Sequence, residues 1–211
     1  MEKLLKGHQK FKAIKFKKNK DLFLKLVKDG QHPGTLFIGC SDSRVVPELI
    51  TGSKPGELFT IQNVGNFVAP YKPDEDYHST ASAIEYAVSV LKVDDVIVCG
   101  HSHCGAIKSL YKDLDKENDL IHTNKWLELG TEAKKVAQLV GGTEEEKLMN
   151  TEKLSAIFQL ENLLTYPAVK RRVEEGSLHL HVWYYKIETG EIEYYDDIKQ
   201  KFIPMESEIR K

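Results

Sequence analysis

Two short segments of this sequence carry side chains that bind soft or borderline metal ions. Cys40 ends one apolar run, and His101 and Cys104 follow another apolar run farther along the chain. Two thiolates and one imidazole are a good ligand set for Zn²⁺, and three protein ligands leave a fourth position open, as in catalytic zinc sites. The sequence therefore predicts a catalytic zinc centre held by Cys40, His101 and Cys104.

Asp42 and Arg44 come directly after the first of these ligands. Two thiolates neutralise the charge of the metal, so a bound water needs help to stay deprotonated and oriented. A carboxylate at Asp42 can accept a hydrogen bond from zinc-bound hydroxide, and Arg44 can hold that carboxylate by a charge-assisted contact. We predict that Asp42 and Arg44 act as a catalytic pair beside the metal.

Apolar segments and helical patterns alternate along the chain. Three continuously apolar segments have the length of strands buried on both faces of a sheet, and helices between strands favour a mostly parallel sheet. Alternating apolar and polar residues on either side of Gly190 predict an antiparallel hairpin. The expected strands are 35–40, 58–62, 95–99, 178–185 and 192–195, and the expected helices are 10–29, 46–51, 79–91, 106–110, 124–139, 143–164 and 168–174.

The three candidate ligands follow the carboxyl ends of two predicted strands, where ligands bind in open α/β sheets. If strands 35–40 and 95–99 are neighbours, Cys40 meets His101 and Cys104 across the end of the sheet. We find no repeat, low-complexity stretch or linker. The prediction is one α/β domain over residues 1–211, with a central mostly parallel sheet, an antiparallel C-terminal strand, flanking helices and an N-terminal helical arm.

Charge is unevenly distributed along the chain. Residues 1–30 contain ten Lys and three acidic residues, a formal charge of about +7, whereas the remainder carries about −9. This segment is either an anion-binding arm or a helix with one solvated face, and its apolar positions favour the second. The net charge of −2 gives no reason to expect a nucleic acid or an anionic membrane as a partner.

Segments that would direct the chain to or across a membrane are not evident. No apolar stretch of the secretory kind follows the basic start, and no window approaches the roughly 18 apolar residues of a membrane span. We expect a cytoplasmic protein, in which cysteines stay reduced and serve metal binding, catalysis or core packing. Cys99 lies inside an apolar run and is expected to be a core residue.

The two ligand motifs resemble those of the β-class carbonic anhydrases. Residues 40–45, Cys-Ser-Asp-Ser-Arg-Val, match the first signature of that family, and residues 100–105, Gly-His-Ser-His-Cys-Gly, match the second. Further similar segments bring the resemblance to about residues 30–196; they are 55–57, 63–66, 83–87, 162–167 and 183–190.

This resemblance implies the zinc-dependent, reversible hydration of carbon dioxide to bicarbonate and a proton, by attack of zinc-bound hydroxide. It implies a homodimer, or a homotetramer built from dimers, with Gln31 reaching the site from the neighbouring subunit and the arm at 1–30 packing on that subunit. The implied substrate-binding residues are Gln31, Phe59, Val64, Tyr86 and Gly105.

One branch of that family carries a bicarbonate-regulated pocket built on a Trp, an Arg and a Tyr. The corresponding positions here hold Phe37, Gln62 and Tyr185, so only the Tyr is present. The sequence therefore resembles the plant-like branch, and we predict that it lacks this second bicarbonate pocket.

Alternatives to this interpretation use the same residues. A relative with the same zinc site would hydrolyse carbonyl sulfide or carbon disulfide. A zinc-stabilised scaffold without activity would need a fourth ligand, either Asp42 or His103. A phosphatase or sulfurtransferase with Cys40 as nucleophile would need a longer loop before Arg44. His103 itself either relays protons or points into solvent.

Overall fold

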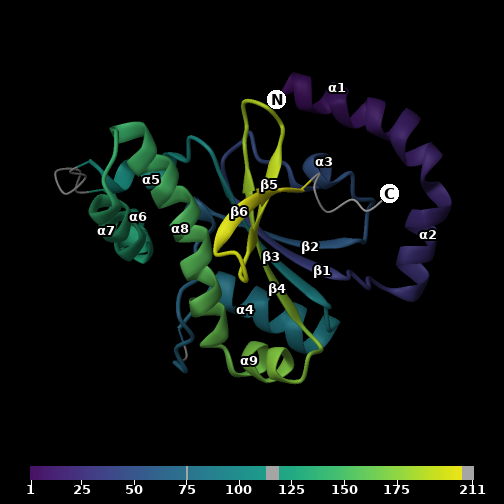
Figure 1. Cartoon of the computed structure of the whole chain (residues 1–211). Coiled ribbons are helices and arrows are strands. Elements are labelled where there is room, and N and C mark those ends of the chain that lie inside the picture. The colour runs from purple at the N-terminus through teal and green to yellow at the C-terminus, as the bar shows by residue number, and fades with distance from the viewer. Residues whose placement is uncertain (75, 113–118, 206–211) are drawn as a thin grey trace.

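The fold is built around one mixed sheet of six strands. The computed structural model describes residues 1–74, 76–112 and 119–205. The strand order is β2-β1-β3-β4-β5-β6, with helices on both sides of the sheet (Figure 1). The strands are β1 (Thr35–Cys40), β2 (Leu58–Asn63), β3 (Asp95–His101), β4 (His179–Tyr185), β5 (Ile192–Asp196) and β6 (Lys201–Pro204).

Strand direction follows the sequence pattern. Strands β2, β1, β3 and β4 are parallel to one another, and β1 and β3 are buried over nearly their whole length, which explains their continuously apolar sequences. Strands β5 and β6 pair antiparallel at one edge. The predicted hairpin is confirmed, but the structure has two antiparallel strands at this end where one was predicted. Strand β6 was missed because it is four residues long and ends in proline.

The helices largely match the sequence prediction, with one exception. The predicted helix 124–139 is divided at Gly130, where a Cβ atom would lie 2.8 Å from Leu110 and 3.0 Å from Phe67. Close packing therefore requires glycine at this position. The elements are α3 (Pro47–Thr51), η2 (Val64–Asn66), α4 (Ser79–Glu85), η3 (Tyr86–Leu91), α5 (Gly105–Leu110), α6 (Ile121–Leu127), η4 (Glu128–Gly130), α7 (Thr131–Val140), α8 (Glu144–Leu164) and α9 (Pro167–Glu174).

Helix α8 is the long helix that supports the site from behind. Thr143 and Glu146 form a capping box at its start, which satisfies amide groups that the helix itself cannot pair. Its buried residues repeat every three or four positions and face the sheet. Contact with β3 is close at Gly100, where a Cβ atom would meet Ala156 at 3.2 Å and the Glu152 carbonyl at 3.3 Å.

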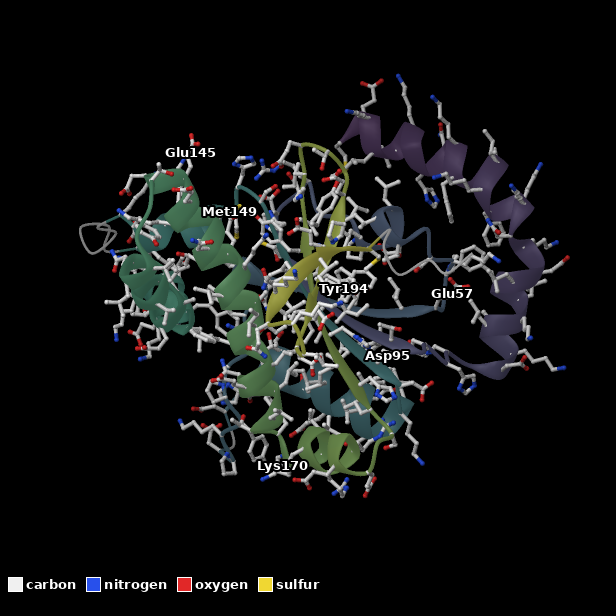
Figure 2. The ribbon with its side chains drawn as sticks, viewed as in Figure 1. Glu57, Asp95, Glu145, Met149, Lys170 and Tyr194 are labelled. Atoms are coloured by element: carbon white, nitrogen blue, oxygen red, sulfur yellow. The ribbon has the colours of Figure 1, made fainter. Side chains whose placement is uncertain are left out.

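The N-terminal arm lies apart from the other helices. It comprises α1 (Glu2–Lys10), η1 (Phe11–Phe16) and α2 (Lys20–Asp29), which confirms the helical prediction over this segment. The arm curves past the β2 side of the sheet, where Glu57 lies beside it (Figures 1 and 2), and Leu26 lies against Gly56. No residue of these three elements is buried, so their apolar side chains have little cover within one chain.

Across residues 1–74, 76–112 and 119–205, no helix combines the length and the apolar composition required to cross a bilayer.

Candidate metal centre

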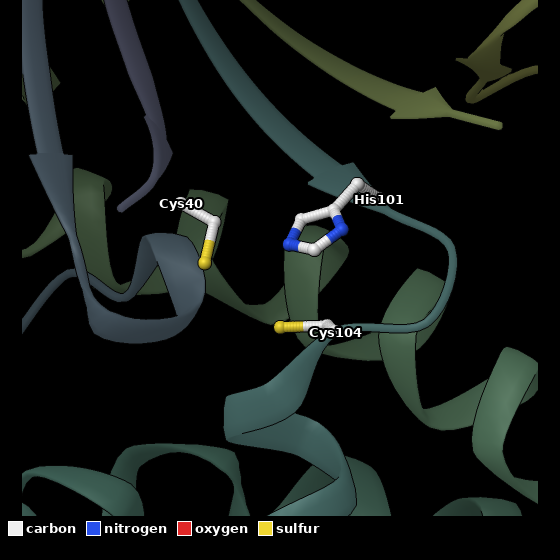
Figure 3. A group of neighbouring side chains, drawn as sticks. All are labelled: Cys40, His101 and Cys104. Atoms are coloured by element: carbon white, nitrogen blue, oxygen red, sulfur yellow. The ribbon is translucent and has the colours of Figure 1, made fainter. Parts of the chain in front are cut away.

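The three predicted ligands come together at the carboxyl end of the sheet. Cys40 is the last residue of β1, His101 is the last residue of β3, and Cys104 directly precedes α5. Their side chains point toward one another (Figure 3), and one ligand atom from each lies within 4.8 Å of the others. All three residues are buried. The adjacency of β1 and β3, which was the condition for this convergence at the sequence level, is present in the structure.

The imidazole of His101 is prepared for a metal. Its Nδ1 lies 2.9 Å from the Ser102 carbonyl oxygen, so Nδ1 carries the hydrogen and Nε2 presents a lone pair. This Nε2 is buried and has no hydrogen-bond partner among the described residues. A buried nitrogen left unpaired is costly, and coordination to a cation would satisfy it. The residues present therefore fit a metal ion.

The two cysteine thiols are electrostatically coupled. Hydrogen bonding by the Cys104 thiol lowers the pKa of Cys40 to about 4, helped by His101 and by the amides of Asp42 and Gly65. The same hydrogen bond, together with burial, raises the pKa of Cys104. A metal ion would displace the shared proton, because thiolates are the metal-binding form.

The amide nitrogen of Gly65 lies 3.4 Å from the sulfur of Cys40. Gly65 has a φ of 82°, and a Cβ atom there would lie 2.8 Å from the Phe67 ring. Only glycine therefore lets the backbone approach the sulfur in this way. The loop after β2 thus stabilises the charged form of Cys40.

Asp42 and Arg44 form a two-point ion pair beside these ligands. The Arg44 Nε donates to Asp42 Oδ1 at 2.9 Å, and its terminal nitrogen donates to Oδ2 at 2.7 Å. Arg44 also donates to the His103 carbonyl oxygen at 3.0 Å, which joins the two ligand-bearing loops. The guanidinium holds the pKa of Asp42 far below its usual range. Asp42 therefore remains a carboxylate, able to accept but not to donate a hydrogen bond.

Gln62 supports the same loop, a role that sequence reasoning missed. Its side-chain nitrogen donates to the carbonyl oxygens of Cys40 at 3.0 Å and Val45 at 3.1 Å. These carbonyls flank the segment that carries Asp42 and Arg44. The only sequence signal was that Gln62 stands at a position where arginine is common in the family that the sequence resembles.

Glu152 is a second residue that sequence reasoning missed. It lies on α8, is 6% exposed, and accepts a hydrogen bond from the Cys104 amide at 2.9 Å. Its other oxygen accepts from the Tyr184 hydroxyl at 2.7 Å. Burial raises the pKa of Glu152. The available signal was an acidic residue on the apolar face of a predicted helix.

The five predicted substrate-binding residues divide into two groups. Val64 and Gly105 lie at the centre: Val64 follows Asn63, the residue paired with Cys40, and Gly105 follows Cys104. A methyl group at Gly105 would meet nothing within 4 Å, so the space beside its α-carbon is open. The structure does not bring the other three, Gln31, Phe59 and Tyr86, to the centre of the same chain.

Strand geometry gives the separation of these three residues from the ligands. Phe59 pairs with Leu36, four residues before Cys40, which is about 13 Å along the strand. Tyr86 stacks on Phe59 with ring centroids 5.9 Å apart and is 45% exposed. Gln31 is exposed and precedes β1, at the opposite end of the strand from Cys40.

The remaining candidates have simple environments. His103 is exposed, with a φ of 57°, and its ring nitrogen lies 3.7 Å from the Glu188 carboxylate. Glu188 also accepts a hydrogen bond from Ser102 at 2.6 Å. Cys99 is fully buried, and burial raises its pKa to about 12, which agrees with the prediction of a core residue.

Comparisons with known proteins converge on one family. The family model for carbonic anhydrase matches residues 35–192. A carbonic anhydrase of Synechocystis sp. is 43% identical over 212 residues, which span 99% of this chain and 76% of that protein. The solved beta-carbonic anhydrase CcaA has a TM-score of 0.89 at 41% identity, covering 100% of this chain and 94% of that one. One of two tetrameric beta-carbonic anhydrases from Sordaria macrospora has a TM-score of 0.80 at 28% identity, covering 92% and 95%.

The ion pair predicts a specific pH dependence. Because Arg44 lowers the pKa of Asp42 in the folded state, the pair stabilises the fold above the unfolded-state pKa of about 3.9, and this contribution is lost as the pH falls. Arg44→Ala should move the Asp42 titration up toward about 3.9, measured by carboxyl ¹³C NMR. Asp196, paired with Lys199, is the internal control and should titrate as before. An Asp42 titration identical in both proteins would contradict the assignment.

Proposed function

The chain belongs to the carbonic anhydrase family, in its β-class, and from this premise we propose that it catalyses the zinc-dependent, reversible hydration of carbon dioxide to bicarbonate and a proton. One observation carries the proposal. The buried, unpaired His101 Nε2 faces two cysteine sulfurs beside the Asp42–Arg44 pair.

Zinc is the metal we propose for this centre. Two thiolates and an imidazole are typical zinc ligands, and a three-residue set leaves a coordination position open for substrate chemistry. When bound, zinc supplies a nucleophile from water near neutral pH. The residues Cys40, His101 and Cys104 would hold it, with the charge of two thiolates balancing that of the metal.

Asp42 and Arg44 orient the attacking water in this reaction. The Asp42 carboxylate accepts a hydrogen bond from the attacking water. This hydrogen bond turns a lone pair of the water oxygen toward carbon dioxide. Arg44 occupies both carboxylate oxygens and so prevents Asp42 from rotating. We propose that the amide of Gly105, the first residue of α5, donates to an oxygen of the substrate, and the space beside its α-carbon is open.

A second copy of the chain would complete the substrate pocket. Gln31 and Phe59 lie too far along the strands to reach the metal centre of their own chain, and the Phe59–Tyr86 pair is partly exposed. We propose a homodimer, or a tetramer of dimers, in which these residues serve the partner's centre. A structural relative from Sordaria macrospora is described as tetrameric, which supports an assembly of this kind.

The arm would cover the partner in this assembly. Its exposed apolar side chains lack cover within one chain, and its charge of about +7 complements the charge of about −9 on the rest of the molecule.

We also propose a cytoplasmic location, where thiols remain reduced. We propose that the chain belongs to the plant-like branch, because Phe37 and Gln62 stand where the bicarbonate-regulated branch has Trp and Arg. The side-chain nitrogen of Gln62 already donates to the carbonyl oxygens of Cys40 and Val45.

Catalysis is tested by stopped-flow hydration of carbon dioxide at pH 8 or above. Zinc-loaded protein should be active, a chelator should abolish the activity, and added zinc should restore it. Asp42→Asn should lower kcat by about 100-fold or more, because an amide is a weaker acceptor and can present a donor instead. Asp95→Asn removes a surface carboxylate that pairs with His181 and should leave the rate unchanged.

Inactivity of the zinc-loaded protein would overturn the proposed reaction. Much faster turnover of carbonyl sulfide or carbon disulfide than of carbon dioxide would instead indicate a hydrolase that uses the same centre.

Sharing of the pocket between copies is tested by complementation. One chain carries Gln31→Ala and Tyr86→Ala, the other carries Asp42→Asn, and each alone should be impaired. When they are co-expressed in equal amounts, half of the dimers are mixed, and one of the two sites in each mixed dimer is intact, so about a quarter of all sites should be active. Activity no higher than the mean of the two separate variants would contradict a shared pocket.

Deletion of residues 1–25 tests the arm. If the arm packs on the partner, its loss should shift the protein toward monomer in sedimentation velocity at micromolar concentration, because apolar contacts between copies are removed. A far-ultraviolet circular dichroism signal reduced only by the helical content of the lost residues would confirm that the truncated chain is folded. An unchanged sedimentation profile would argue against this role.

A further inference from the structure

Glu152 is a buried carboxylate that the proposed reaction does not use. It lies among the buried residues of α8 with 6% of its surface exposed. Placing a carboxylate in a protein interior is unfavourable unless hydrogen bonds replace those lost from water. Both oxygens have such partners, the Cys104 amide at 2.9 Å and the Tyr184 hydroxyl at 2.7 Å.

The first of these contacts reaches a metal ligand directly. Cys104 is the residue before α5 and has an extended conformation, with φ −65° and ψ 121°. Its amide is therefore outside any helical hydrogen bond and would be unpaired without Glu152. A hydrogen bond at this amide restricts rotation about the backbone of Cys104, and hence the direction in which Sγ points.

The second contact fixes the carboxylate itself. Tyr184 lies on β4, is 2% exposed, and holds the oxygen that does not face Cys104. Gly100 lets α8 approach β3 closely enough for Glu152 to reach past the end of that strand. The carboxylate is thus clamped between β4 and the second ligand loop.

We propose that Glu152 is a positioning residue, which together with Tyr184 orients Cys104 toward the metal. This inference rests on the proposed function of the centre as a zinc site. Groups that orient metal ligands typically change metal affinity by about 10–100-fold when they are removed. Glu152 touches neither substrate nor metal ion in this role.

Two substitutions of Glu152 separate the effect of side-chain length from the effect of side-chain charge. Glu152→Asp keeps the charge but is one methylene too short for the Cys104 amide, whereas Glu152→Gln keeps the length and one acceptor oxygen. The affinity for Zn²⁺ alone is measured by competition with a chromophoric chelator. We expect Glu152→Asp to bind Zn²⁺ about 10–100-fold more weakly and Glu152→Gln to bind like wild type. Thiolate-to-metal charge-transfer bands of the Co²⁺-loaded proteins should shift in the Asp variant only.

Gln159→Asn is the matched control. Gln159 lies on the same buried face of α8 and also accepts from a backbone amide, that of Val68 at 2.8 Å, but this amide belongs to no metal ligand. The shortening is again one methylene. Gln159→Asn should lower the urea midpoint of the metal-free protein while leaving its Zn²⁺ affinity unchanged, because its effect is confined to packing.

Three results would overturn the inference: wild-type Zn²⁺ affinity in Glu152→Asp, an equal loss in Gln159→Asn, or an equal loss in Glu152→Gln. If Glu152→Asp does not fold, Tyr184→Phe decides, since it frees one oxygen of Glu152 and should weaken Zn²⁺ binding several-fold. Unchanged affinity and an unchanged Co²⁺ spectrum in Tyr184→Phe would then overturn it. Failure of the wild-type protein to bind Zn²⁺ would instead refute the proposed function.

Discussion

The backbone hydrogen bonds between β1 and β3 set a register in which Gly39 lies opposite Cys99. In that register Cys40 and His101, the last residues of the two parallel strands, lie at the same end of the sheet. A shift by one residue would turn each side chain to the opposite face of the sheet. Every other feature of the centre, from the Asp42–Arg44 pair to the helix that carries Glu152, depends on this pairing of β1 with β3.

Charge around the centre is organised in compensating groups. Hydrogen bonding by the Cys104 thiol lowers the pKa of Cys40 and favours its thiolate, and Asp42 is matched by Arg44. The carboxylate of Glu152 is satisfied by two hydrogen-bond donors. Because each charge has a nearby partner, the site can be buried without an uncompensated ion, which is the arrangement that protein interiors tolerate.

The sequence was most informative where function is local along the chain. Cys40, Asp42 and Arg44 fall within one loop, and His101 and Cys104 within another, so their residue types and spacing were enough to predict the convergence. Alternation of apolar runs with helices predicted the parallel sheet, but the strand order β2-β1-β3-β4 comes from the structure alone. Residues 35–40 even have the bounds predicted from their apolar sequence.

Other features depend on contacts between distant segments, which one sequence does not reveal. Gln62 and Glu152 reach the ligand loops only after β2 and α8 have packed, and position 130 needs glycine because Leu110 and Phe67 leave no room for a side chain. The resemblance implied a substrate-binding role for Phe59 but not its distance from the centre of its own chain.

The carbonyl of His103, which accepts from Arg44, shows how the centre is divided between two parts of the chain. His101 and Cys104 share one short loop, whereas Cys40 arrives only through a pairing between strands far apart in sequence. Local contacts form early in folding, and distant strand pairings form later because they close long loops. The centre therefore depends on two kinds of contact: a short loop that keeps His101 and Cys104 close together, and a pairing of distant strands that brings Cys40 to them.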